Sequence, residues 1–136
     1  MPVVEYRLVR DGYSDEQIAA LLLSSCELFA AELACPVDRV RAYAHMVEPS
    51  HACLGGHAAT EVEDAPFFSF YLLEGRSMEQ RQSLLAGFTD LLVAHLGVDR
   101  ARIRGTVEMV DPSHWAIAGK PASVVRQAEI AARGPH

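Results

Sequence analysis

The chain contains two similar heptapeptides: His45-Met46-Val47-Glu48-Pro49-Ser50-His51 is followed 63 positions later by Glu108-Met109-Val110-Asp111-Pro112-Ser113-His114. The same offset pairs Gly12 with Gly75. Upstream of Gly12 the offset becomes 64, which pairs Pro2 with Pro66. A repeat of this period indicates two copies of one supersecondary unit that must pack together to bury their apolar faces.

Each copy predicts a strand, a helix and a second strand. Seven-residue runs rich in β-branched and aromatic residues predict the first strands. Ser14 and Ser77 each precede a Gln by three positions, which is a capping box that starts a helix. The expected elements are strands at Val3–Val9 and Phe67–Leu73, helices near 14–34 and 77–96, and second strands at Arg39–Val47 and Arg102–Val110.

The predicted fold class is α/β (α+β), a tandem β-α-β repeat. Each second strand lies parallel to its first strand through a right-handed crossover. If the two first strands pair antiparallel, the result is a four-stranded mixed sheet with both helices on one face. We expect one domain made of units 2–62 and 66–120 plus a C-terminal tail, with a terminal helix over 122–133. The uncovered sheet face predicts an oligomer.

Composition excludes several classes of protein. Half of the 136 residues are hydrophobic and none of the apolar runs reaches membrane-spanning length, so we expect no membrane partner. The formal charge of -6, with scattered Lys and Arg, argues against nucleic-acid binding. Three cysteines without a C-x-x-C pair fit a reducing compartment, and with no signal peptide before Pro2 we expect a cytoplasmic protein.

The second copy closely resembles 4-oxalocrotonate tautomerases, which are about as long as one copy. The resemblance rests on Pro66-Phe67-Phe68, Leu73-Glu74-Gly75-Arg76-Ser77 and His114-Trp115-Ala116-Ile117-Ala118-Gly119. The whole chain resembles the fused, two-unit branch of the tautomerase superfamily, which includes malonate semialdehyde decarboxylase and cis-3-chloroacrylic acid dehalogenase. This resemblance implies a trimer, no cofactor and no metal.

The resemblance also implies that Pro2 is the catalytic group. Removal of Met1 leaves a secondary amine that can carry a proton near neutral pH, whereas with Met1 attached the nitrogen is an unreactive amide. Pro66 is always an amide, so one of the two equivalent sites must be inactive.

Antiparallel pairing of the first strands places Pro2 near the end of the second copy's first strand. Arg76, the family's substrate-binding arginine, follows that strand, whereas Tyr13 stands at the matching position of the first copy. Trp115, the family's apolar wall, is matched by Ala52. We therefore expect Pro2, Arg76 and Trp115 to form one pocket, in which Arg76 binds a carboxylate.

Other candidate residues follow from the same resemblance. A second family arginine, which reaches the site across the oligomer interface, matches both Arg104 and Arg41, and the sequence leaves the choice open. Asp38 falls where the decarboxylases have a catalytic aspartate, although a polar residue before a strand is the commoner meaning. The ligand-type residues between His45 and His57 resemble a zinc site, but the repeat changes several of them, which favours a structural turn.

The first hypothesis is a cofactor-free isomerase of an unsaturated or enolisable 2-oxo acid, with Pro2 as general base. One alternative is a decarboxylase or 3-haloacrylate dehalogenase in which Pro2 is a general acid. Another, from a different class, is a non-catalytic trimer that only binds a ligand.

Overall fold

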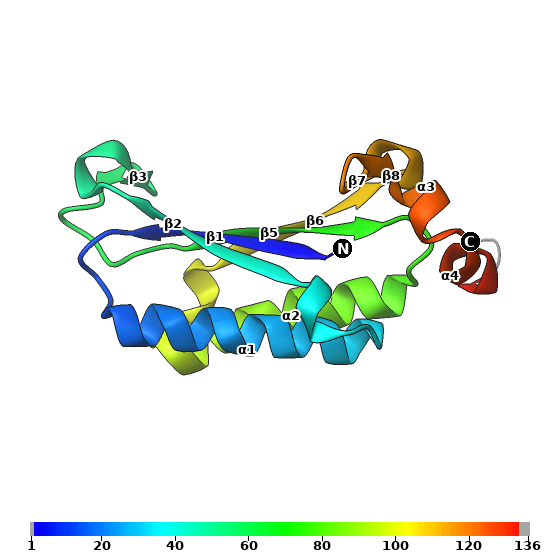
Figure 1. The fold of residues 1–136 in the computed structure, drawn as a ribbon. Coiled ribbons are helices and arrows are strands. Elements are labelled where there is room, and N and C mark those ends of the chain that lie inside the picture. Colours follow the sequence, from blue (N-terminus) through cyan, green and yellow to red (C-terminus); the bar gives the residue numbers. More distant parts are fainter. Residues whose placement is uncertain (1, 134–136) are drawn as a thin grey trace.

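The computed structural model describes residues 2–133. A four-stranded sheet in the order β2-β1-β5-β6 carries two long helices on one face (Figure 1). The sheet contains β1 (Val3–Val9), β2 (Arg41–Val47), β5 (Phe67–Leu73) and β6 (Arg104–Val110), and the helices are α1 (Asp15–Leu33) and α2 (Met78–Leu96). The shorter elements are the hairpins β3 (Cys53–Leu54) with β4 (His57–Ala58) and β7 (Ala116–Ile117) with β8 (Lys120–Pro121), and the helices α3 (Ala122–Val125) and α4 (Gln127–Arg133).

The strand pairing confirms the mixed sheet expected from the repeat. β1 runs parallel to β2, with Val3 opposite Arg41, and β5 runs parallel to β6. The two first strands pair antiparallel, with Val3 opposite Tyr71. The start of β1 therefore lies beside the end of β5, which sets the position of the residue before β1.

The capping boxes define where both long helices begin. The Ser14 side chain accepts a hydrogen bond from the Gln17 N–H, and the Gln17 side chain accepts one from the Ser14 N–H. Ser77 and Gln80 repeat this arrangement at α2. Each box satisfies N–H groups that the first helical turn leaves unpaired. Within residues 2–133 no helix is long and apolar enough to cross a membrane.

Three predicted elements differ from the structure. The second strands begin two residues later than expected, at Arg41 and Arg104, because the residues before them form 3-10 turns at Val37–Arg39 and Arg100–Arg102. The expected terminal helix is two helices, α3 and α4, since Arg126 between them leaves helical geometry at φ -111° and ψ 23°. The Arg126 N–H still donates to the Ala122 carbonyl at 2.8 Å, so the chain changes direction here but stays hydrogen-bonded to α3.

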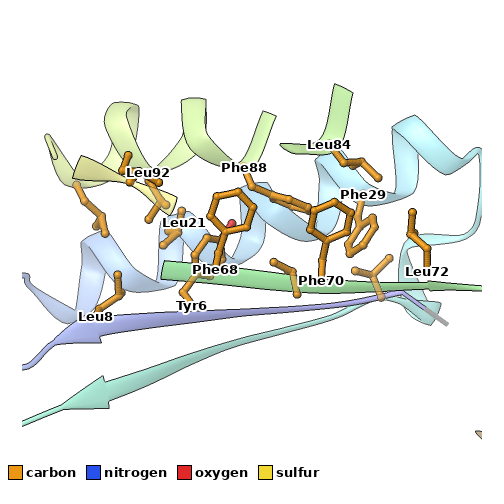
Figure 2. Packing of buried hydrophobic residues seen from close by; sticks show 14 of the residues in the cluster. Tyr6, Leu8, Leu21, Phe29, Phe68, Phe70, Leu72, Leu84, Phe88 and Leu92 are labelled. Atoms are coloured by element: carbon orange, nitrogen blue, oxygen red, sulfur yellow. The ribbon is translucent and has the colours of Figure 1, made fainter. Parts of the chain in front are cut away.

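The core lies between the sheet and the two helices (Figure 2). Alternate residues of β1 and β5 point into it, so each of these strands has one buried face. Phe88 of α2 packs edge-on against Phe29 of α1 and Phe70 of β5, with ring centroids 5.1 Å apart in both pairs. These rings tie both copies into one core.

The opposite face of the sheet has no cover within the described chain (Figure 1). Tyr43 and Phe67 point to this face and are 49% and 37% exposed. Arg7 and His45, also on this face, are exposed as well. A mixed face of aromatic and charged residues resembles an interface more than a solvated surface.

Candidate active site

Pro2 is buried directly before β1. Its carbonyl accepts a hydrogen bond from the Arg41 N–H at 3.0 Å, which extends the β1–β2 ladder by one step. Pro66 repeats this contact with Arg104 at 3.1 Å. The two prolines are thus equivalent in the backbone and lie at opposite ends of the sheet, and their different surroundings must distinguish them.

A small cavity of about 30 Å³ lies against Pro2, large enough for about one water molecule. Leu33, Leu72 and Leu73 form its apolar part. Its polar part contains four arginines and one carboxylate: Arg39, Arg76, Arg126, Arg133 and Glu129. A wider depression of about 470 Å³ shares many of these residues and adjoins it. The base candidate therefore lies at the inner end of an anion-attracting pocket.

Arg76 follows β5 and is half-buried in this cavity. Its Nη1 donates to the Leu33 carbonyl at 3.1 Å, which satisfies one of the free carbonyls at the end of α1. Burial lowers the pKa of Arg76, and the charge of Arg133 lowers it further. An arginine keeps its charge under such shifts, so the cavity retains a fixed cation.

The C-terminal helix α4 closes one side of the cavity. Figure 1 places α4, the end of α1 and the start of β1 at the same end of the molecule. Both carboxylate oxygens of Glu129 accept hydrogen bonds from Arg39, each at 3.0 Å. The Nε of Arg126 lies 3.9 Å from the same carboxylate. The hydrogen bonds from Arg39 hold the pKa of Glu129 below its ordinary value.

Trp115 does not line this cavity, so in the single chain only Pro2 and Arg76 of the expected trio meet. The Trp115 ring packs against Tyr71, with centroids 6.1 Å apart, and lines a separate depression with His114 and Lys120. Tyr71 points to the uncovered face of the sheet, whereas the Pro2 cavity opens toward the end of α1.

Three further candidates also lie outside the cavity. The Arg41 backbone touches Pro2, but its guanidinium turns back to two carbonyls of the preceding turn at 2.9 and 3.2 Å. Arg104 makes the same turn-closing contacts at 2.8 and 2.9 Å beside Pro66, at the far end of the sheet. Asp38 is exposed. Within the described chain, therefore, none of the three faces Pro2.

The sequence reading missed Arg39 and the side chains of α4 that line the cavity. Glu129 and Arg133 are four residues apart and share one face of α4, and Arg126 lies directly before this helix. That spacing predicts a charged helix face. It does not predict that Arg39 pairs with Glu129, because the two residues are 90 positions apart.

At the Pro66 end of the sheet, the carboxylate of Asp64 lies where the Pro2 end has arginines. Asp64 accepts hydrogen bonds from the Tyr13 hydroxyl at 2.7 Å and from the Val9 N–H at 3.0 Å. Burial raises the pKa of Tyr13, and Asp64 raises it further, so the hydroxyl stays protonated. This end offers an anionic environment, the opposite of the environment around Pro2.

The sequence pattern of a family described as "Tautomerase enzyme" matches residues 66–124. A probable tautomerase of Ralstonia nicotianae is 36% identical over 62 residues, which cover 46% of this chain and 89% of the relative. A 2-hydroxymuconate tautomerase of Comamonas testosteroni is 39% identical over 57 residues, or 42% of this chain and 90% of that enzyme.

Solved structures match over both copies. A native fused 4-OT superposes with a TM-score of 0.84 at 21% identity, covering 91% of this chain and 98% of that one. A fused 4-OT described as a symmetric trimer gives 0.81 at 18% identity, covering 90% and 98%. A member of the cis-3-chloroacrylic acid dehalogenase family gives 0.73 at 16% identity, covering 94% and 99%.

Proposed function

The chain belongs to the tautomerase family, and on that premise we propose that it is a cofactor-free isomerase of an unsaturated or enolisable 2-oxo acid. Pro2 is the general base and Arg76 binds the substrate carboxylate. This proposal is supported by the small cavity that Pro2 and Arg76 share at the arginine-rich end of the sheet.

The surroundings of Pro2 favour a neutral amine. A free α-amino group titrates at about 7.7–8.0. Leucine side chains and several arginines around the cavity both disfavour the protonated form, since burial and nearby cations each oppose a new positive charge. After removal of Met1, the Pro2 nitrogen is therefore suited to accept a proton at neutral pH.

The reaction moves one proton and needs no further reactant. Neutral Pro2 removes a proton from the enol hydroxyl or from an acidic carbon of the substrate, which leaves a delocalised enolate. Arg76, held by the Leu33 carbonyl, binds the carboxylate beside the developing charge and stabilises it. The protonated Pro2 returns the proton to another carbon of the conjugated chain, so the product is an isomer and the base is regenerated.

We further propose that the protein is a homotrimer in which neighbouring subunits complete each site. The uncovered sheet face needs a partner, and a structurally similar fused protein is described as a symmetric trimer. Arg104 or Arg41, which are exposed, and the half-buried Trp115 are the residues that such an assembly would bring to a neighbour's cavity. Sedimentation at micromolar concentration should give three times the monomer mass of 14.9 kDa.

The alternative enzymatic reading has less support. In that reading water adds to an activated acid before carbon dioxide or halide is lost, so a group must orient the water, and Asp38, the candidate for it, is exposed and lies outside the cavity.

A substrate screen with matched proline variants tests the proposal. Protein whose mature terminus has been checked by mass spectrometry is assayed with 2-hydroxymuconate, phenylenolpyruvate and 3-haloacrylates. We expect turnover of an enolisable acid, and we expect Pro2→Ala to lower kcat by orders of magnitude. Pro66→Ala, at the equivalent backbone position, should leave kcat unchanged. Equal loss of activity in both folded variants would refute the assignment of Pro2.

A further inference from the structure

The carboxylate of Glu129 occupies an arginine fork next to the cavity. Arg39 donates to it from Nη1 and Nη2, each at 3.0 Å, which is the two-pronged geometry that a guanidinium makes with any carboxylate ligand. The Arg126 Nε, 3.9 Å from Glu129, is buried and has no hydrogen-bond partner in the described chain. The pair of arginines is therefore an anion site that a side chain of the same molecule now fills.

The ion pair of Arg39 and Glu129 lies where the cavity beside Pro2 adjoins the wider depression. Arg39 and Glu129 line both the inner cavity and the outer depression. The inner cavity, at about 30 Å³, is far too small for a six-carbon acid, whereas the outer depression, at about 470 Å³, has the size of a ligand site. An acid that binds Arg39 in the outer depression would take the place of the Glu129 carboxylate.

Displacement is feasible because α4 is held weakly. The helix has seven residues, and none of them is buried. The Arg39 and Glu129 side chains retain 25% and 43% of their exposure, so their ion pair contributes little free energy in water. A ligand that offers its own carboxylate to Arg39 replaces the lost pair, whereas a ligand that lacks one leaves Arg39 unpaired.

We propose that Glu129 is an internal carboxylate that holds the Arg39–Arg126 anion site until a second carboxylate of the substrate takes its place. The substrate is then a dicarboxylate, bound by Arg76 near Pro2 and by Arg39 at its far end. Only the first of these contacts rests on the proposed function, because the anion site is defined without reference to catalysis.

Binding of two matched acids tests the proposal without turnover. Trans,trans-muconate and sorbate have the same six-carbon diene, and sorbate has a methyl group where muconate has its second carboxylate. Dissociation constants are measured by titration calorimetry. Glu129→Gln, which keeps the side-chain shape, should tighten muconate binding about fivefold, as expected for the loss of one exposed ion pair. Glu16→Gln, in the first turn of α1 at the other end of the sheet, is the control and should change nothing.

Arg39→Met should affect the binding of the two acids differently. It should weaken muconate binding at least tenfold and leave sorbate binding unchanged or tighter, because only muconate uses Arg39 and the internal ion pair is gone. Unchanged or weaker muconate binding to Glu129→Gln, no muconate binding to any form, or equal weakening of both acids by Arg39→Met would each overturn the proposal. These outcomes are independent of whether Pro2 is the base.

A second measurement reports whether the Glu129 carboxylate leaves the Arg39–Arg126 anion site. Cys35 lines the cavity beneath α4, so its alkylation by iodoacetamide, followed by peptide mass analysis, measures access. The rate at Cys35 should rise in Glu129→Gln while the rate at exposed Cys53 stays constant. An unchanged rate at Cys35 would contradict the role of Glu129 as a displaceable group.

Discussion

Arg76→Ala should lower kcat/KM for an anionic 2-oxo acid by about 10- to 150-fold. Of the five N–H donors of the guanidinium, the bond to the Leu33 carbonyl uses one, and the side chain lines the cavity beside Pro2. A hydrogen bond to a charged group contributes about 1.5–3 kcal/mol, and the expected loss is that energy expressed as a rate.

The pH dependence of Arg76→Ala tests whether the Arg76 charge also favours the neutral form of the Pro2 amine. Removing a cation beside Pro2 favours the protonated amine, so more alkaline conditions are needed to obtain the neutral base. The acidic limb of kcat/KM against pH should therefore move upward in Arg76→Ala. Arg76→Lys keeps the charge but loses the planar fork, so its limb should stay near the wild-type position while KM rises.

Arg100→Ala is the matched control, since this exposed arginine pairs with Asp90 near the Pro66 end and should change neither parameter. Wild-type kcat/KM in Arg76→Ala, or an equal shift of the acidic limb in Arg76→Ala and Arg76→Lys, would show that Arg76 does not have these two roles.

Two further predictions concern the reaction and the fold. Asp38→Ala should leave isomerisation unchanged, because the side chain is exposed and lies outside the cavity; loss of activity in this variant, together with a rate that falls as the pH rises through neutrality, would favour the decarboxylase or dehalogenase alternative. Gly105→Ala should destabilise the protein by about 1–3 kcal/mol and lower Tm by several degrees, since a Cβ there would overlap the buried ring of Phe68. An unchanged Tm in a thermal melt would mean that the ring can move aside.

The repeat explains why the fold was predictable. The limits of β1 and β5 were predicted correctly, because both are central strands whose apolar runs end at turn residues on each side. The starts of β2 and β6 were predicted two residues too early. Their first residues are equally compatible with a strand and a 3-10 turn, and the local hydrogen bonds of the turn decide between them.

The site was less predictable than the fold. Strand pairing placed Pro2 near Arg76, since an antiparallel register is a local consequence of the repeat. It did not place Trp115, because the turn after β6 carries that ring to the other face of the sheet. It also gave no sign of Glu129, whose position depends on the bend at Arg126. Contacts that depend on the path of a tail have no periodic signal in sequence.

If the Pro2 nitrogen carries the proton, activity depends on whether that nitrogen is an amine or an amide. The same chain is prepared with Pro2 at the terminus and with one extra residue in front of it, and the mass of each form is checked. The two forms differ at one nitrogen, which is an amine in the first and an amide in the second. We expect the extended form to keep its fold but to lose about 10²- to 10⁴-fold in kcat, the usual contribution of a general base. Equal activity of the two forms would contradict it.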